Sequence, residues 1–481
     1  VAPADAPPTF TGTLRAYQRE GLGWLHFLRR FGLGGCLADD MGLGKTVQVL
    51  ALLETRRLEG HGPSIVVVPR SLVFNWLREA GRFTPALRIR DFSQGERRPE
   101  SIDATQVDVI VTTYGSLRRD APMLAGVEFD YAILDEAQAI KNASTATAKA
   151  SRLLRARHRL AMSGTPIENR IEELWSLLEF LNPGMLGASA TFASAARQMA
   201  APSADDARIA HDVVADGQSV LARALRPLIL RRTKEHVAPE LPERIEQTLE
   251  VELEPKQRKF YDAVRVLAQR TVMARVARDG IQKSQLHILE ALLRLRQAAC
   301  HPALADPSKH ALPSAKLDAL IPALIAIAAE GHKSLVFSQF TELLALVRQR
   351  LDADGVRYEY LDGRTRDRQA RVDRFQDDAD CPVFLISLKA GGQGLNLTAA
   401  DYVYLLDPWW NPAVEAQAID RAHRIGQTRR VVATRLVARD TIEAKILALQ
   451  ATKRALADSV LTADRGGLAS IGRAELELLL S

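Results

Sequence analysis

Cysteines and long apolar runs are what this 481-residue chain has least of. Its three cysteines, Cys36, Cys300 and Cys381, form no C-x-x-C pair, which argues against a disulfide framework and against a structural zinc site. A membrane-spanning helix needs about 20 apolar residues. The longest candidate, Leu317 to Ala329, is interrupted by an aspartate and a proline. The sequence therefore predicts a protein of a reducing compartment without a membrane role.

The N-terminus has none of the features of a targeting segment. The first residue is Val1 rather than Met, and Ala2 to Pro8 is Pro-rich, without the basic and apolar regions of a signal peptide. We expect residues 1–12 to be a linker at the truncated N-terminus of a longer protein.

Length and charge set broad limits. A chain of this length with 47% hydrophobic residues is long enough for two or three packed domains and too long for a single core. The formal net charge of +6 fits a phosphate-rich partner, but many proteins rich in Ala and Arg are equally basic. The partner must be inferred from motifs.

Short apolar runs alternate with amphipathic stretches, which is typical of βαβ units and a parallel sheet. The predicted strands fall into two series, separated by stretches of helical periodicity at 182–225 and 254–300. The first series is Ile65–Val68, Val107–Thr112, Tyr131–Leu134 and Arg159–Met162; the second is Ser334–Phe337, Tyr358–Leu361, Val383–Ile386, Tyr402–Leu406 and Val431–Leu436. The predicted fold class is α/β, with two parallel-sheet lobes and helical insertions.

The predicted domain boundaries follow from these series. The first lobe spans 13–235 and contains the helical insertion near 182–225. Residues 236–312 are predicted to be a linker and a helical insertion of the second lobe, with Ala238 to Glu250 as a long polar linker. The second lobe spans 313–481 and ends in helices.

A phosphate-binding loop is predicted at Asp40 to Thr46, between a short apolar run and a helical stretch. Gly42 and Gly44 allow the tight turn that aims backbone amides at phosphates. Lys45 can neutralise the phosphates and the Thr46 hydroxyl can ligate Mg²⁺. The loop departs from G-x-x-x-x-G-K-T because Asp39 occupies the first glycine position.

Two adjacent carboxylates, Asp135 and Glu136, follow the predicted strand Tyr131–Leu134. Open α/β sheets bind ligands at the carboxyl ends of their strands. Asp135 suits Mg²⁺ coordination through water, and Glu136 suits polarisation of an attacking water. A lone Asp-Glu pair would more often be the acidic cap of the next helix, but the following Ala137-Gln138 and Ile140-Lys141-Asn142 make this pair specific.

These and further motifs resemble, in order, the two-lobed motor of superfamily-two helicases, and specifically the Swi/Snf family of double-stranded DNA translocases. The resemblance covers nearly the whole chain from Leu14 onward. In the first part, the matching segments are Leu14–Gly21 (Q motif), Asp39–Thr46 (I), Val66–Pro69 (Ia), Val111–Tyr114 (Ib), Asp135–Gln138 (II) and Ser163–Pro166 with Asn169 (III). In the second part, they are Val336–Phe340 (IV), Asp362–Thr365, Lys389–Leu397 leading into Asp407–Pro412 (V) and Gln417–Gln427 (VI).

The resemblance implies two RecA-like lobes and an ATP site divided between them, with ATP and Mg²⁺ as cofactors. Lys45, Glu136, Arg421 and Arg424 would be catalytic, with Glu136 as the base and the two arginines stabilising charge on the γ-phosphate. The residues expected to bind the nucleotide or the metal are Gln18 (at the adenine), Gly42, Gly44, Lys45, Thr46, Asp135, Gly394 and Gln417, with Thr46 and Asp135 on Mg²⁺. Arg421 and Arg424, at positions i and i+3, are expected to share one helical face, which Gln417 joins one turn earlier.

The resemblance also implies contacts with the phosphates of duplex DNA, without strong sequence preference. The candidates are Arg70, Thr113, Ser338, Lys389, Trp409 and Asn411. Trp409 could equally be a core residue, because a Trp pair before a Pro is more often buried. The basic segment Arg226–Arg232 resembles the brace between the lobes of this family, or it simply caps a helix.

The leading hypothesis is an ATP-driven translocase on double-stranded DNA that strips or remodels bound protein without separating the strands. One alternative is a strand-separating DNA or RNA helicase, and another, of a different class, is an ATP-gated nucleic-acid-binding scaffold without turnover. Motif II reads Asp-Glu-Ala-Gln, which with the Arg- and Ala-rich composition indicates a prokaryotic member. We then expect a cytoplasmic, nucleoid-associated protein, or a nuclear one if the source is eukaryotic. One chain carries every motif for one ATP site, so a monomer is sufficient; the protein cargo is not indicated.

Overall fold

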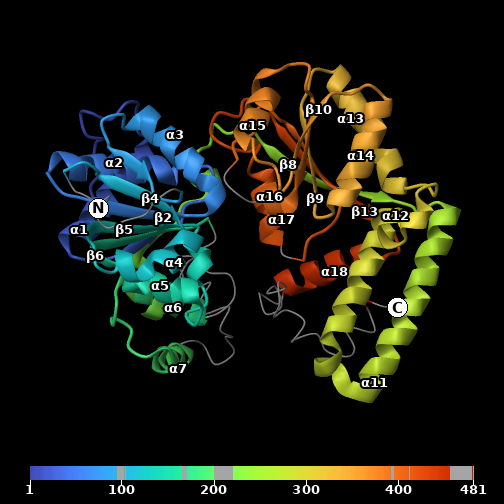
Figure 1. The fold of residues 1–481 in the computed structure, drawn as a ribbon, viewed down its shortest axis with the longest axis horizontal. Coiled ribbons are helices and arrows are strands. Elements are labelled where there is room, and N and C mark those ends of the chain that lie inside the picture. Colours follow the sequence, from blue (N-terminus) through green and yellow to red (C-terminus); the bar gives the residue numbers. More distant parts are fainter. Residues whose placement is uncertain are drawn as a thin grey trace. The chain divides into compact units, whose positions relative to one another are not determined.

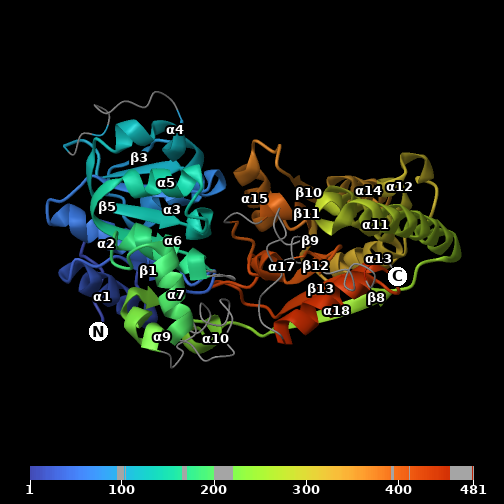
Figure 2. The same cartoon turned by 90° about the horizontal axis from the view of Figure 1, so that it is seen from below.

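The computed structural model describes residues 1–94, 102, 105–164, 171–199, 220–391, 395–410, 412–455 and 479. The chain divides into two compact units, Val1–Pro239 and Glu240–Ser481. Figures 1 and 2 show that each unit has its own sheet flanked by its own helices. The two predicted α/β lobes are confirmed.

Unit 1 is built on a wholly parallel sheet, with the order β3-β4-β2-β5-β6-β1-β7 among its described strands. The strands are β1 (Gly35–Leu37), β2 (Ser64–Val68), β3 (Ile89–Asp91), β4 (Val109–Thr113), β5 (Glu128–Asp135), β6 (Arg155–Met162) and β7 (Ile229–Leu230). The central strand β2 is buried along its whole length because helices cover both faces, which explains its unbroken apolar sequence.

The helices of unit 1 lie on the two faces of this sheet, with α2 and α3 on one face and α4, α5 and α6 on the other (Figure 1). Their bounds are α1 (Ala16–Arg30), α2 (Lys45–Leu58), α3 (Val73–Phe83), α4 (Tyr114–Leu124), α5 (Ala146–Leu153), α6 (Ile171–Leu181), α7 (Ser189–Met199), α9 (Val220–Leu225) and α10 (Lys234–Val237), with 3₁₀ turns at Arg70–Leu72, Ala137–Ile140 and Arg226–Leu228. The predicted helical insertion at 182–225 is helical in its described parts, α7 and α9.

Unit 2 is also built on a parallel sheet, with the order β10-β11-β9-β12-β13-β8 in its described part. The strands are β8 (Arg244–Val251), β9 (Ser334–Ser338), β10 (Tyr358–Leu361), β11 (Val383–Ser387), β12 (Tyr402–Leu405) and β13 (Val431–Ala438). The helices are α11 (Pro255–Cys300), α12 (Pro302–Ala305), α13 (Ala315–Ala329), α14 (Thr341–Ala353), α15 (Arg368–Asp377), α16 (Leu388–Gly391), α17 (Pro412–Ile419) and α18 (Ile442–Ala455), with a 3₁₀ turn at Pro307–Lys309.

The prediction of a linker at Ala238 to Glu250 was wrong for most of its length. Residues Arg244–Val251 form β8, which pairs with β13 from Arg244↔Val431 to Val251↔Ala438. This strand lies at the edge of the sheet and is exposed over most of its length, so its polar sequence does not show the apolar signature of a buried strand.

The helical insertion predicted at 254–300 is α11, which bends sharply at Gly280, where φ is 78° and ψ is 164°. The two halves fold back on one another, as Figure 1 shows. The predicted apolar stripe separates into two faces. Ile288, Leu292 and Leu295 are buried in the hairpin core, whereas Leu286, Leu289 and Leu293 are exposed.

All three cysteines are buried and free. Among the helices that the structure describes, none has both the length and the apolar character that crossing a lipid bilayer requires.

Candidate nucleotide and nucleic-acid sites

The parallel sheet of unit 1 brings the predicted motifs to one edge. The carboxyl end of β1 leads into the phosphate loop, that of β5 carries Asp135, and that of β6 is followed by Ser163. The neighbouring strands β2 and β4 pair at Val68↔Thr113, so Thr113, the last residue of β4, and Arg70, two residues beyond the end of β2, lie at adjacent strand ends. Segments far apart in sequence therefore lie together because parallel strands share one carboxyl edge.

The phosphate loop has the backbone that its glycines predict. Gly42 and Gly44 have φ values of 91° and 74°, a region that L side chains avoid. A Cβ added to Gly44 would lie 2.6 Å from Gln18 Nε2. Lys45 begins α2, and its Nζ donates to the backbone carbonyls of Asp39 (2.5 Å) and Asp40 (3.3 Å). The Lys45 ammonium is therefore hydrogen-bonded to the phosphate loop itself. Thr46, the next residue, is half-buried.

Gln18 is buried and is hydrogen-bonded to the backbone of the phosphate loop. Its Nε2 donates to Leu43 O (3.1 Å) and to the Tyr17 hydroxyl (3.4 Å), while its Oε1 accepts from Arg15 N–H (3.0 Å). Tyr17 Oη donates to the same Leu43 carbonyl (2.8 Å). Both ends of the Gln18 amide are engaged by the protein, so this side chain supports the loop backbone; its predicted contact with adenine stays a prediction.

Asp135 is held by donors on both carboxylate oxygens. Trp76 Nε1 donates to Oδ2 (2.8 Å) and the Glu136 N–H donates to Oδ1 (2.9 Å). The Tyr114 hydroxyl donates to the Asp135 backbone carbonyl (2.7 Å). Burial, followed by the neighbouring charge of Glu136, raises the pKa of Asp135 to about 7. Sequence analysis did not identify Trp76, and it included Tyr114 in motif Ib without its contact with Asp135, because no local pattern links either residue to this carboxylate.

Glu136 has a left-handed backbone, with φ of 52° and ψ of 56°. Such a conformation costs a non-glycine residue about 1 kcal/mol or more, and residues held in it cluster at functional sites. Gln138 Nε2 donates to Glu136 Oε2 (2.7 Å), and Ser163 Oγ donates to Gln138 Oε1 (3.0 Å). The amide of Gln138 therefore fixes the carboxylate and is itself oriented by the serine at the end of β6. Thr165, Pro166 and Asn169 of the predicted motif III lie outside the described residues.

The oxygen atoms of Asp135 and Thr46 fit Mg²⁺. This ion prefers hard oxygen ligands, and in nucleotide sites it takes one or two from the protein and the rest from phosphate and water. Clusters of three or more His, Cys, Asp or Glu side chains that could hold a metal without a nucleotide are not found among the residues that the structure describes. The donor set therefore suits a metal that is bound together with a phosphate group.

The arginines of the second unit are not on one helix, which corrects the helical spacing argued from sequence. α17 ends at Ile419, and Arg421 and Arg424 lie in the turns that follow. These turns are fixed because Gln427 Nε2 donates to the carbonyls of Thr398, Ala400 and Ala422.

The two arginines differ in burial. Arg421 is 0% exposed, and its backbone carbonyl accepts from Leu397 N–H (3.0 Å). Arg424 and Gln417 are half-buried, and Arg424 Nε donates to Asp420 O (3.2 Å). Arg424 is therefore the more accessible guanidinium of the two. Gly394, the remaining predicted nucleotide contact of this unit, lies outside the described residues.

Ser338 is not at the surface, which contradicts its predicted contact with DNA. It is 0% exposed at the end of β9, and its Oγ donates to Asp407 Oδ1 (2.5 Å). Asp407 is itself buried, and burial raises its pKa. Ser338 therefore positions a carboxylate at the start of the segment that carries Trp409.

The segment after β12 is also tied to the helices of unit 2. Arg296 of α11 donates to Pro408 O (2.5 Å) and Gln339 Oε1 (3.1 Å). Lys316 of α13 donates to Leu406 O (2.5 Å) and forms an ion pair with Glu443 of α18 (2.6 Å). These buried partners were missed from sequence because their residues lie on otherwise apolar helix faces.

The other predicted DNA contacts have varied environments. Arg70 is exposed, and Thr113 Oγ1 caps α4 by accepting from Ser116 N–H (3.1 Å). Trp409 is partly buried against the core of unit 2, and its backbone N–H donates to Glu415 Oε1 (2.7 Å). Lys389 lies on α16, but its side chain and the whole of Asn411 lie outside the described residues. The Arg226–Leu228 part of the proposed brace is a 3₁₀ turn.

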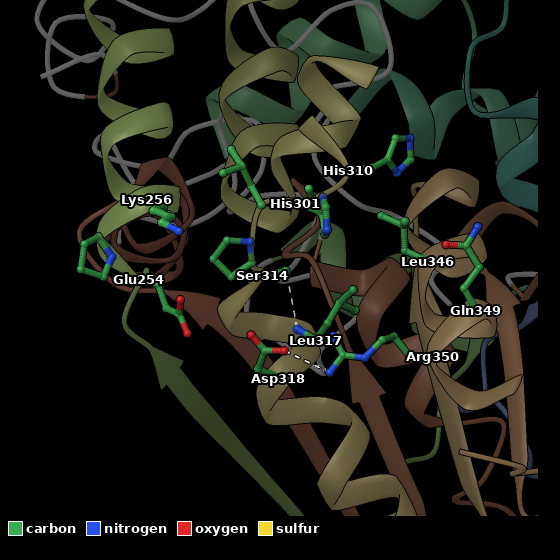
Figure 3. Close-up of a pocket in the computed structure, with 14 residues that line it drawn as sticks. Glu254, Lys256, His301, His310, Ser314, Leu317, Asp318, Leu346, Gln349 and Arg350 are labelled. Carbon is green, nitrogen blue, oxygen red and sulfur yellow. Dashed lines mark hydrogen bonds and ion pairs between the residues drawn. The ribbon is translucent and has the colours of Figure 1, made fainter. Parts of the chain in front are cut away.

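Unit 2 also has a pocket of about 650 Å³ between α11, α13 and α14, shown in Figure 3. Asp318 and Arg350 form an ion pair across its floor (3.1 Å). Burial, and then the charge of His310, lowers the pKa of His301 to about 4, so His301 is neutral at pH 7. None of the residues lining this pocket belongs to the predicted nucleotide or DNA sites.

Comparison with known proteins agrees with the motif order. The family model of the SNF2-related domain matches residues 17–304, and that of the helicase conserved C-terminal domain matches residues 315–426.

Three relatives illustrate the range of similarity. YwqA of Bacillus subtilis, provisionally named an ATP-dependent helicase/translocase, is 38% identical over 98% of this chain and 51% of its own length. The TATA-binding protein-associated factor MOT1 of Saccharomyces cerevisiae is 33% identical over 98% of this chain and 29% of its own length. The solved SWI2/SNF2 ATPase core of Sulfolobus solfataricus in complex with dsDNA is 33% identical and covers 100% of this chain and 98% of its own, with a TM-score of 0.45. The chain thus spans about half or less of the length of the curated relatives that it matches.

Proposed function

Since this chain belongs to the SNF2-related family, we propose that it is the ATP-hydrolysing motor of a translocase that moves along double-stranded DNA and displaces or remodels bound protein. The observation that carries this proposal is the chemistry at one sheet edge of unit 1. There a phosphate loop with Lys45 adjoins Asp135 and Glu136, and Gln138 Nε2 donates a 2.7 Å hydrogen bond to Glu136 Oε2. A purely structural loop would not need this set of groups.

The proposed reaction is phosphoryl transfer from ATP to water. The Lys45 ammonium, now on the carbonyls of Asp39 and Asp40, would move to the β- and γ-phosphates, and the amides of the Gly42–Gly44 turn would face them. Thr46 and Asp135 would hold Mg²⁺, which supplies positive charge against the phosphate oxygens. Glu136 would orient the attacking water and accept its proton.

The second unit would supply arginine side chains to the developing charge. Arginines of this kind contribute about 10³ to 10⁵ in rate in phosphoryl-transfer enzymes. Arg424 is the better candidate for direct contact, because it is partly exposed whereas Arg421 is 0% exposed. Reliance on residues from two units would make ATP turnover depend on their arrangement, and this dependence is the basis of a motor.

We further propose that duplex DNA is held mainly by its phosphates. Thr113 ends β4 and Arg70 follows the end of the neighbouring strand β2, and Arg70 is exposed. Phosphate contacts give affinity without reading the sequence, which suits a protein that must step along DNA. Ser338 is no longer a candidate because it is buried.

The two alternatives make different predictions. A strand-separating helicase would be stimulated by single strands, whereas a scaffold would bind ATP without turning it over. The complete set of Lys45, Asp135, Glu136 and Gln138 favours turnover, because a scaffold does not require an oriented catalytic carboxylate.

The experiment is a measurement of steady-state ATP hydrolysis without nucleic acid and with duplex DNA, single-stranded DNA and duplex RNA. Glu136→Gln is the matched blank, since it keeps the shape of the side chain and removes the base. Stimulation by duplex DNA that is lost in this variant is the expected result. Stimulation by single strands or RNA alone would favour a conventional helicase, and ATP binding without turnover under all conditions would favour the scaffold.

A further inference from the structure

The segment that leads out of unit 1 is attached to the beginning of the phosphate loop. β7 pairs in parallel with β1 through Cys36↔Ile229 and Leu37↔Leu230. The pairing then continues beyond both strands into the loop. Ala38 N–H donates to Leu230 O (2.7 Å), Asp40 N–H donates to Arg232 O (2.9 Å), and Lys234 N–H donates to Asp40 Oδ2 (3.0 Å).

The side chain of Arg232 strengthens this attachment. Its Nε donates to Asp39 Oδ1 (2.9 Å) and its Nη2 to Asp39 Oδ2 (2.5 Å), a bidentate pair in which the Asp39 side chain is 0% exposed and that of Arg232 is 10% exposed. The remaining donors reach Gln48 Oε1 (2.9 Å) and the Tyr17 carbonyl, and the guanidinium lies 5.2 Å from the centre of the Tyr17 ring.

Gly21 makes room for this arrangement. A Cβ added there would lie 1.9 Å from Gln48 Oε1 and 2.8 Å from Arg232 Nη2. The packing around the guanidinium is therefore tight, and the position of Arg232 is fixed by the loop, by α2 through Gln48 and by α1 through Tyr17.

Asp39 and Asp40 also bind the phosphate-loop lysine, Lys45. Its Nζ donates to the backbone carbonyls of Asp39 and Asp40, the residues whose side chains hold Arg232 and Lys234 N–H. A nucleotide whose phosphates attract the Lys45 ammonium would break its hydrogen bonds to these two carbonyls. The backbone of Asp39 and Asp40 is thus joined on one side to the phosphate-binding lysine and on the other to residues 232–234.

These residues lead directly to unit 2. α10 ends at Val237, unit 1 ends at Pro239, and β8 of the second sheet begins at Arg244. The acidic residue at the first glycine position of the phosphate loop therefore has a structural explanation: Asp39 binds the arginine of the exit segment.

We propose that the Asp39–Arg232 ion pair couples occupancy of the phosphate loop to the exit segment, residues 230–238, and that Arg232 is a positioning residue of the motor. The inference rests on the proposed function, because it assumes that the loop binds ATP. It adds a series of contacts within unit 1 through which phosphate binding would alter the segment that connects to unit 2. A two-state response of this kind requires contacts that differ between the empty and occupied loop, and the Lys45 contacts supply that difference.

The test is hydrogen–deuterium exchange of residues 230–238 in the whole chain, with Mg²⁺ alone and with Mg²⁺ plus a non-hydrolysable ATP analogue. Nucleotide affinity is measured in parallel with a fluorescent ATP analogue. The variants are Arg232→Gln and Asp39→Gly, and the control is Arg231→Gln, which changes the exposed neighbour of the same residue type. Removal of one partner of a buried ion pair is destabilising, so thermal unfolding identifies any variant that fails to fold. Asp39→Gly is a second variant that removes the ion pair, and glycine is the usual residue at that position of a phosphate loop.

We expect nucleotide to change the exchange rates of residues 230–238 by about fivefold or more in the wild type and in Arg231→Gln. In a folded Arg232→Gln or Asp39→Gly variant that still binds nucleotide, the change should fall below about twofold. An undiminished response in either variant, or wild-type binding without a response, would overturn the inference and leave the proposed function intact. Failure of the wild type to bind the analogue would overturn both.

Discussion

The indole Nε1 of Trp76 donates a 2.8 Å hydrogen bond to Oδ2 of Asp135, and this bond connects α3 to the carboxylate that is proposed to hold Mg²⁺. Trp76 is 1% exposed, so its ring cannot turn away without disturbing the core. The bond fixes the orientation of the carboxylate and leaves it lone pairs for the metal or its water.

Loss of this donor is predicted to weaken metal binding. Trp76→Phe removes the N–H and keeps most of the ring, and the Mg²⁺ concentration for half-maximal nucleotide binding should rise about tenfold, as for other residues that orient metal ligands. The control is Trp175→Phe, which removes an indole donor to Gly187 O (3.0 Å) in the same unit. Binding of a fluorescent ADP analogue at increasing Mg²⁺ measures the effect. Equal Mg²⁺ requirements of the two variants would show that the bond has no such role.

Gln138 is predicted to act through Glu136. Gln138→Ala leaves the carboxylate without its 2.7 Å donor, and kcat for ATP should fall about tenfold while KM stays within about twofold. Ser163→Ala should have a smaller effect in the same direction, because Gln138 can still reach Glu136 after losing its own 3.0 Å donor. Steady-state kinetics at saturating duplex DNA provide both constants. A rise in KM with unchanged kcat would instead mean that Gln138 serves ATP binding.

Arg70 is predicted to contact a DNA phosphate. Arg70→Ala should weaken duplex binding for all sequences alike, and it should reduce the slope of log K against log salt by about one. The matched control is Arg78→Ala, which removes an exposed arginine from α3. Fluorescence anisotropy with two unrelated duplexes between low and moderate salt measures both quantities. An unchanged salt slope in Arg70→Ala would remove this residue from the DNA surface.

His301 is predicted to make the stability of unit 2 depend on pH. Its folded-state pKa of about 4 lies below the unfolded value of 6.5, so the unfolded chain binds the proton first as pH falls. The contribution of His301 is therefore fully present above pH 6.5 and is lost as pH falls from 6.5 towards 4, by up to about 3 kcal/mol.

His301→Asn tests this dependence. Asparagine can still accept the hydrogen bond that His301 Nδ1 accepts from Ala303 N–H (3.0 Å), but it does not titrate. Urea unfolding at pH 7 and pH 4.5 should show a smaller loss of stability in His301→Asn than in the wild type. The control His61→Asn, at a partly exposed histidine of unit 1, should lose as much stability as the wild type. Identical pH dependence of all three proteins would contradict the assignment.

The sequence predicts the sheets well where burial is complete. β2, β9 and β11 are buried along their whole lengths, so their apolar runs identify them without ambiguity. β8 was mistaken for a linker because an edge strand keeps polar side chains on both exposed faces. β3 and β7 are too short for any periodicity to show.

The residues of the site were predictable only where a motif names them. Asp135 and Glu136 lie at the end of β5, and Lys45 begins the helix that follows β1, so all three belong to the carboxyl edge of the sheet, where open α/β sheets bind ligands. Trp76 and Arg232 act across long sequence separations, through contacts 59 and 193 residues apart, and no local pattern reports such a pairing. The burial of Ser338 and Arg421 could not be predicted either, because a motif position does not state which face of the fold a side chain occupies.

The central claim is ATP-driven movement along duplex DNA without strand separation, and displacement of a third strand tests it most directly. A labelled triplex-forming oligonucleotide is placed on a duplex whose own strands carry a second label, and both signals are followed after addition of Mg²⁺ and ATP. We expect release of the third strand with the duplex intact, and no release by Glu136→Gln. Separation of the duplex strands, or failure to release the third strand while duplex DNA stimulates ATP hydrolysis, would contradict it.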